Sequence, residues 1–402
     1  MQPMRRRAAV VIVSVIVLAG GLVARPFVRG LSFVVRAADV HGVARRLASI
    51  GTYAESEREI VIDGPGGVSR GHVPIPGRLY LPDVAPRRFT LLVSGLHAAG
   101  IDEPRLVAIA RQIAASGVAV VTPAIPELQL FNITSQITDD IEAAALWTST
   151  KFAVAAGDGR IGLVGISFSG GLSIVAAGRP SLGGKIAYVL SLGGHDDLPR
   201  VLRYLCTGVE PPLPRSVRLP GEDTSRARPP HDYGVAVILL GVADKLVPKA
   251  QTAMLQSAVR RFLYASYLDG VDKARAEREF ASLRDLADTL PEPSATLLKY
   301  VNARDVAHLG ARLLPYIAAY GGDPALSVSR SPKPSAPVFL LHGADDNVIP
   351  SIESEYLAED LRGHAPVRLL LSDLISHAGV NHTPRAVDVI TLAGFWGDLL
   401  GR

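Results

Sequence analysis

The feature that most constrains the fold is a short apolar run that ends in a serine flanked by small residues. The run Ile161–Val164 is followed by Gly-Ile-Ser-Phe-Ser-Gly, and Leu172–Ala177 then has the composition of a helix. A strand that turns sharply at a serine into a helix strains the serine backbone, so only small residues fit two positions before and after it. Gly165 and Ser169 meet that requirement, with Ser169 standing where glycine is usual. The pattern predicts a nucleophile elbow at Ser167, with a plain strand-to-helix turn as the alternative.

Apolar strands and amphipathic helices alternate on both sides of this motif. The predicted strands are 59–62, 78–81, 89–93, 118–121, 185–192, 338–341 and 367–371, and the predicted helices are 104–116, 137–152, 352–362 and 385–400. Uninterrupted apolar strands that alternate with helices indicate a parallel sheet covered on both faces. We therefore expect an α/β fold with a mostly parallel, doubly wound sheet.

The alternation breaks between residues 195 and 334, where helix signals dominate. Gln251–Ala265 and Val271–Leu290 are predicted helices, and Glu210–Pro230 is a loop rich in proline and charge. We interpret 195–334 as a largely helical lid inserted into the sheet. The core is then expected in two parts, which are residues 59–194 and 335–402.

The N-terminal segment differs in kind from the rest of the chain. Arg5–Arg7 precede an uncharged run from Ala8 to Ala24, at the short end of the membrane-spanning range of about 17–25 residues. A signal peptide has a similar layout, and residues 19–21 would suit its cleavage. We expect residues 1–29 to be a membrane anchor with the arginines in the cytoplasm and the bulk of the chain outside, or a cleaved signal that leaves a secreted protein. Residues 30–58 are expected to form an amphipathic helical linker on the membrane or on the domain.

Composition excludes some classes of partner. The net charge is +4, the arginines are scattered, and the chain has neither zinc-finger spacing nor a phosphate-binding glycine loop. Nucleic acid is therefore not an expected partner. The single cysteine, Cys206, excludes an internal disulfide and is expected to be a buried apolar residue.

Two later segments, each directly after a predicted strand, carry acids and histidines. Asp345 and Asp346 follow the strand at 338–341, and His377 and His382 follow the last strand. A serine hydroxyl needs an adjacent base that is itself oriented by an acid, and reactive groups gather at the carboxyl ends of parallel strands. The order serine, acid, histidine therefore predicts a catalytic triad. His377 is preferred over His382 because it lies nearer the strand end.

The segment His-Gly-Ala-Asp-Asp-Asn-Val-Ile-Pro at 342–350 resembles that of the α/β-hydrolase superfamily, especially its dienelactone-hydrolase and prolyl-oligopeptidase-like branches. The resemblance places Asp346 as the acid and leaves Asp345 to cap the following turn. It also implies an oxyanion hole formed by the backbone amides of Phe168 and Leu96. Ser94 departs from the family's usual histidine in the loop that carries Leu96.

Two further acidic segments are not expected to supply the catalytic acid. Asp244 sits in a sequence that echoes the acid segment, but its surroundings predict a lid helix. His195, Asp196 and Asp197 follow the strand at 185–192, where a loop role is expected.

The resemblance implies a serine hydrolase that cleaves a carboxylic ester through Ser167, His377 and Asp346, with no metal or organic cofactor. The expected substrate is a small, partly apolar acyl compound. A peptidase or an acyltransferase would use the same residues. A non-catalytic, membrane-tethered binding protein is the alternative from another class.

Overall fold

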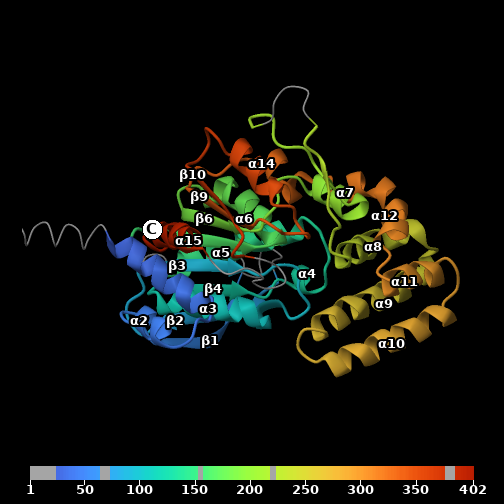
Figure 1. The fold of residues 1–402 in the computed structure, drawn as a ribbon, viewed down its shortest axis with the longest axis horizontal. Coiled ribbons are helices and arrows are strands. Elements are labelled where there is room, and N and C mark those ends of the chain that lie inside the picture. Colours follow the sequence, from blue (N-terminus) through green and yellow to red (C-terminus); the bar gives the residue numbers. More distant parts are fainter. Residues whose placement is uncertain (1–23, 64–72, 153–156, 218–222, 376–384) are drawn as a thin grey trace, which may run out of the picture.

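The computed structural model describes residues 24–63, 73–152, 157–217, 223–375 and 385–402, which are organised around an eight-stranded sheet (Figure 1). The strand order is β1-β2-β4-β3-β5-β6-β9-β10. The strands are β1 (Glu55–Ile62), β2 (Ile75–Pro82), β3 (Phe89–Val93), β4 (Ala119–Pro123), β5 (Ile161–Ile166), β6 (Ile186–Leu192), β9 (Val338–Gly343) and β10 (Val367–Ser372). β1 and β2 pair in antiparallel fashion, β2 pairs antiparallel with β4, and the remaining pairs are parallel. The expected mostly parallel α/β sheet is confirmed.

Both faces of the sheet are buried because its central strands consist mainly of apolar residues. Leu91 and Leu163 belong to the core on one face, and Leu92 and Val164 belong to the core on the other. The first face is covered by α5 (Gln136–Phe152), α6 (Phe168–Ala177) and α14 (Ile352–Asp360), and the second by α3 (Pro104–Ala115) and α15 (Ala386–Leu400). The structure thus has the doubly wound arrangement that the alternation predicted.

The insertion is helical, and its helices stand together beside the sheet (Figure 1). They are α7 (Leu198–Thr207), α8 (Tyr233–Leu246), α9 (Lys249–Leu268), α10 (Lys273–Thr289), α11 (Ser294–Asn302), α12 (Val306–Leu313) and α13 (Ile317–Tyr320), with a two-stranded pair β7 (Val209–Glu210) and β8 (Arg226–Ala227). The remaining short elements are α4 (Pro126–Gln129) and 3-10 turns at Gly100–Asp102, Pro180–Leu182, Leu314–Tyr316, Pro324–Leu326 and Val328–Arg330. Asp244 lies exposed on α8 beside Lys245, in the lid helix that its surroundings predicted.

The stretch from Gly30 to Ala48 is two helices rather than the one amphipathic helix that its periodicity predicted. The first spans residues 24–37 and the second is α2 (Val43–Ala48). Asp39 and Gly42, both with positive φ, separate them because that backbone conformation is incompatible with an α-helix.

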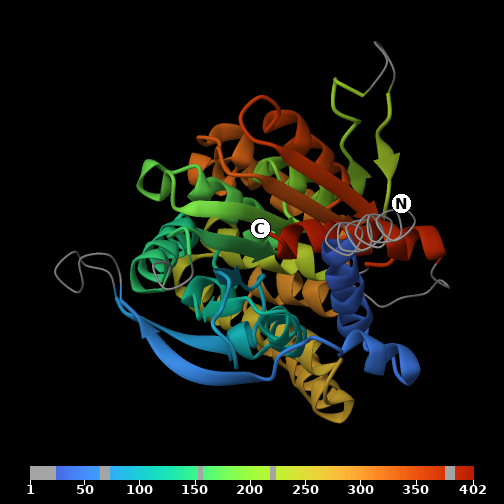
Figure 2. The same ribbon diagram turned by 90° about the vertical axis from the view of Figure 1, so that its left-hand side faces the viewer.

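The first of these helices packs on the domain, beside α15 (Figure 2). Phe33 is buried, with its ring centroid 4.1 Å from that of Trp396. Arg36 is also buried and donates a 2.8 Å hydrogen bond to the Ser116 hydroxyl. Of the two locations expected for this helix, the membrane surface and the domain surface, the structure shows the domain surface.

Of the predicted anchor or signal segment, residues 1–29, only residues 24–29 are described, and they belong to the first of these helices. Among the helices in the described part of the chain, none combines the length and the apolar character that crossing a membrane requires.

Candidate active site

Ser167 stands at a sharp turn between β5 and α6. Its backbone has φ 56° and ψ −128°, a region that a non-glycine residue enters only at a cost. A Cβ atom added to Gly165 would lie 2.2 Å from the carbonyl oxygen of Ser169, so only glycine fits two residues before the serine. The geometry is that of the predicted nucleophile elbow.

Ser169, which replaces the usual glycine, has a hydroxyl that is bonded into the turn. Its Oγ lies 3.0 Å from the backbone nitrogen of Ile166, which donates to it. The same hydroxyl lies 3.1 Å from the carbonyl oxygen of Val93 and 2.9 Å from that of Ile166. The elbow is therefore hydrogen-bonded to the last residue of β3, and the loop that contains Leu96 follows that residue.

The two predicted oxyanion donors flank Ser167. Phe168 is the first residue of α6, so its amide is among those without an intrahelical acceptor. On the other side, an added Cβ on Gly95 would come within 3.2 Å of Ser167 Cβ, which places the loop after β3 directly against the nucleophile. Leu96 lines the same cavity as Ser167. Both residues thus lie beside Ser167, with Phe168 buried and Leu96 partly exposed.

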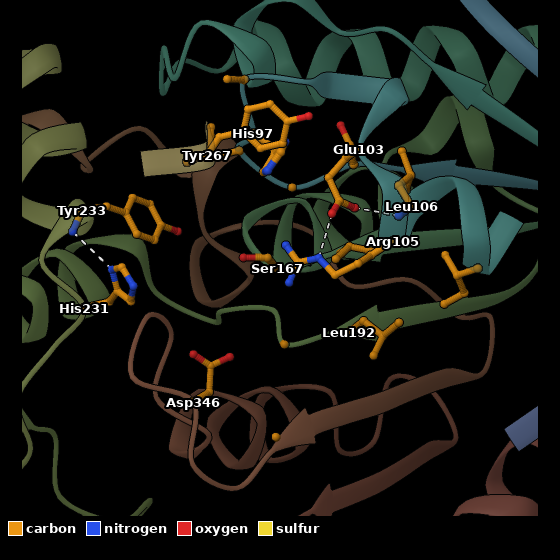
Figure 3. Close-up of a pocket in the computed structure, with 18 of the residues that line it drawn as sticks. His97, Glu103, Arg105, Leu106, Ser167, Leu192, His231, Tyr233, Tyr267 and Asp346 are labelled. Atoms are coloured by element: carbon orange, nitrogen blue, oxygen red, sulfur yellow. Dashed lines mark hydrogen bonds and ion pairs between the residues drawn. The ribbon is translucent and has the colours of Figure 1, made fainter. Parts of the chain in front are cut away.

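Asp346 lies in the loop after β9 and lines the same cavity as Ser167 (Figure 3). Its Oδ1 accepts hydrogen bonds from the backbone amides of Val348 and Ile349, at 2.8 and 3.0 Å. Asp346 is 3% exposed, whereas Asp345 is exposed. The turn-capping role expected of Asp345 is thus performed by Asp346, because only the inward-pointing carboxylate reaches these amides.

His342 is a supporting residue that the sequence reasoning did not single out. It is fully buried in β9, with Nδ1 2.7 Å from the Ser354 hydroxyl and Nε2 2.9 Å from the carbonyl oxygen of Ile349. Its Nε2 also lies 3.5 Å from Asp346 Oδ2. The imidazole therefore contacts Asp346 and Ile349, two residues of the loop that follows β9, which is called the acid loop below. The sequence could have indicated this residue, because His342 is the histidine of the His-Gly pair at the start of segment 342–350.

His377 and His382 lie outside the described residues. The chain that leads to them leaves β10 at Ser372, and Ile375 lines the cavity that contains Ser167 and Asp346. Ile375, the last described residue before the segment that carries both histidines, therefore lies at the site.

The cavity at Ser167 has a volume of about 390 Å³. Its walls are mainly apolar, and its polar lining groups besides Ser167 and Asp346 include His97, Glu103, Arg105, His231 and Tyr267 (Figure 3). Lid and core are joined at its edge, where the His231 amide donates to the carbonyl oxygen of Asn347 at 2.8 Å.

Glu103 and Arg105 form an ion pair at the mouth of this cavity. Arg105 Nε lies 2.7 Å from Glu103 Oε1, and the Arg105 side chain is 71% exposed. Burial opposes ionisation of Glu103, but the hydrogen bond and charge of Arg105 outweigh it and hold the pKa of Glu103 below its usual value. The mouth therefore presents a cation whose partner carboxylate stays ionised.

His97 and Tyr233 are uncharged parts of the cavity wall. Burial lowers the pKa of His97, whose ring meets Tyr267 edge-on with centroids 5.0 Å apart. Burial raises the pKa of Tyr233, and the negative charge of Asp346 raises it further. His97 and Tyr233 therefore add no charge to the cavity wall.

The segment His195–Asp197 has the structural role that was expected of it. His195 is buried and stacks on Phe168 with ring centroids 5.0 Å apart. Asp196 is buried and lies 3.0 Å from Arg200, which also contacts the buried Glu353 at 2.6 Å. Asp197 caps α7 through the amide of Arg200. These residues join the start of the lid to α14, and His195 packs against the first residue of α6, next to Ser167.

Within the described ranges, no three His, Cys, Asp or Glu side chains are grouped closely enough to hold a metal ion. Cys206 is buried in the lid, and burial raises the pKa of its thiol to about 12.

The strand order, the elbow after β5 and the acid loop after β9 are those of the α/β-hydrolase fold. The described part of the chain thus has the topology of this fold, with Ser167 at the turn between β5 and α6.

No protein-family model matches the sequence, and no curated protein matches it. Among solved structures, it is similar to an acylaminoacyl peptidase from Pyrococcus horikoshii at 12% identity and a TM-score of 0.41, covering 84% of this chain and 40% of that one. An esterase from Pyrobaculum calidifontis is 16% identical with a TM-score of 0.43, over 94% and 93% of the two chains. A thermostable esterase from Pseudomonas putida is 13% identical with a TM-score of 0.45, over 89% and 88%. The chain spans less than half of the peptidase, and at these identities none of the three assigns an activity to it.

Proposed function

We propose that this protein is a serine hydrolase that cleaves carboxylic esters through an acyl-enzyme intermediate. The observation that carries the proposal is that Ser167, whose backbone is strained, lines the same cavity as the buried carboxylate of Asp346. Backbone strain of this kind at a functional serine is retained only where the surrounding structure imposes it. Here Gly165 leaves room for the close approach of the backbone, and the hydroxyl of Ser169 holds the turn through its hydrogen bonds.

In the proposed mechanism, His377 takes the proton of Ser167 as the hydroxyl attacks the ester carbonyl carbon. Asp346 orients the imidazole and stabilises its positive charge. The amides of Phe168 and Leu96 stabilise the oxyanion. The proton then passes to the departing alcohol, and a water molecule activated by His377 hydrolyses the acyl-enzyme.

The apolar cavity walls favour an ester of a partly apolar compound over a charged peptide. The peptide bond and transfer of the acyl group to another alcohol remain the alternative reactions, since the same residues would perform them. Competing alcohols and amines in the assay distinguish these reactions through their products.

The test is hydrolysis of a series of p-nitrophenyl esters by the wild-type chain and by Ser167→Ala. We expect Ser167→Ala to lose at least about 10³-fold in kcat. His377→Ala should lose as much, whereas His382→Ala should retain most of the activity. Equal activity of wild type and Ser167→Ala would overturn the proposal.

We also propose that the N-terminal segment attaches the enzyme to a membrane with the hydrolase domain outside the cytoplasm. The support is the order of Arg5–Arg7 and the apolar run Ala8–Ala24. The test is sedimentation of the full chain and of a chain lacking residues 1–24 with membranes after alkaline extraction. Loss of the full chain from the membrane pellet would contradict this location.

A further inference from the structure

A second, smaller cavity opens from Ser167 on the side of the lid. Its volume is about 40 Å³. Its walls come from Val201 and Leu205 on α7, Val237 and Ile238 on α8, and Val348 and Ile349 of the acid loop. Apart from Leu96, Ser167 and Tyr233, every residue that lines it is buried. The cavity is therefore an apolar recess between lid and core.

The two cavities meet at the proposed reaction centre. Leu96, Ser167 and Tyr233 line both of them, whereas Phe168 lines only the smaller one. A carbonyl group held at Ser167 would thus have one substituent in each cavity. Tyr233, at the first turn of α8, lies between the two.

The two cavities differ in what they can accept. The larger one reaches the exposed Arg105 and its partner Glu103, so a polar group can leave through it and water can enter. The smaller one offers apolar side chains around the Ser167 hydroxyl. Because the alcohol must depart before water attacks the acyl-enzyme, the alcohol side belongs in the larger cavity and the retained acyl chain in the smaller one.

Resting on the function proposed above, we propose that the smaller cavity is an acyl subsite that selects short, unbranched acyl chains. A water-sized group needs about 10–15 Å³ of such volume, so a 40 Å³ recess holds roughly three methylene or methyl groups. The preferred substrates are then propionyl and butyryl esters. Within the recess, each added methylene raises kcat/KM about fourfold, and hexanoyl and longer chains lose activity because they overfill it.

Val237 allows the subsite to be resized within one lid helix. Val237→Ala enlarges the recess, and Val237→Leu fills part of it. Val242→Ala is the matched control, because Val242 is as buried on the same helix and lines neither cavity. Melting temperatures of all three variants test whether the lid remains folded.

The experiment measures kcat/KM for p-nitrophenyl acetate, butyrate, hexanoate and octanoate. We expect wild type and Val242→Ala to prefer butyrate by at least about tenfold over hexanoate. Val237→Ala should raise the hexanoate-to-butyrate ratio about tenfold, and Val237→Leu should shift the preference to acetate. If hydrolysis depends on Ser167 but neither Val237 variant changes the chain-length profile, the subsite is overturned and the hydrolase proposal stands. If Ser167→Ala leaves hydrolysis unchanged, both fail.

Discussion

The hydroxyl of Ser169 lies 3.1 Å from the carbonyl oxygen of Val93, and this contact joins the elbow to the strand that leads into the proposed oxyanion loop. Ser169 is fully buried, and its hydroxyl also accepts from the backbone nitrogen of Ile166. The serine that departs from the usual glycine therefore connects the proposed nucleophile and oxyanion elements.

Replacing Ser169 with alanine should lower the free energy of unfolding by about 1–3 kcal/mol, because the Ile166 amide loses its acceptor. Urea denaturation measures the change. Ser173→Ala on the same helix is the control, since the described residues provide no hydrogen-bond partner for its buried hydroxyl, and its loss should be nearly neutral. Equal effects of the two substitutions would contradict the role given to Ser169.

Gly165→Ala should prevent the elbow from closing. The added Cβ would lie 2.2 Å from the carbonyl oxygen of Ser169, which is backbone and cannot move without displacing Ser167. We expect little folded protein and no ester hydrolysis. Gly394→Ala on α15, whose added Cβ would meet only Arg368, at 3.6 Å, among the described residues, should fold and gain up to about 1 kcal/mol of helix stability. Normal activity in Gly165→Ala would refute this geometry.

Asp346→Asn should reduce kcat by about 10³- to 10⁴-fold while the protein stays folded, because the amide oxygen can still accept from Val348 and Ile349. Asp345→Asn should change kcat less than about threefold, since that side chain is exposed. Steady-state kinetics and melting temperatures of both variants test the assignment. A larger loss in Asp345→Asn than in Asp346→Asn would reverse it.

Asp196 should make stability depend on pH. Burial, reinforced by the charge of Glu353 and opposed by Arg200, raises the pKa of Asp196 to about 7. The folded state therefore retains a proton that the unfolded state loses near pH 4. This contribution to stability is complete below about pH 4 and is lost as the pH rises to about 7. Asp196→Asn has no proton to lose, so wild type should lose stability relative to it between pH 5 and pH 8 in urea denaturation. A constant difference over that interval would contradict the raised pKa.

The central sheet and the elbow could be predicted because their signals are local. Continuous apolar runs such as Phe89–Val93 fix buried strands, and the strain at Ser167 restricts residues two positions away. The order of the acid and histidine segments followed from the same alternation, since each directly follows a strand.

The remaining features depend on backbone conformation and packing that the pattern of residue types does not show. The break between the two N-terminal helices rests on the backbone at Asp39 and Gly42, which periodicity does not report. Which of Asp345 and Asp346 points inward is decided by the packing of the acid loop on β9. The smaller cavity is formed by α7, α8 and the acid loop together, so no single segment such as 195–334 could reveal it.

The most direct test of the account is the mass of the protein after reaction with a fluorophosphonate probe, followed by peptide mapping. We predict a single stoichiometric adduct on Ser167, absent in Ser167→Ala and strongly slowed in Asp346→Asn. Failure of the folded wild-type chain to react, or an adduct that persists in Ser167→Ala, would contradict the assignment of Ser167 as an activated nucleophile.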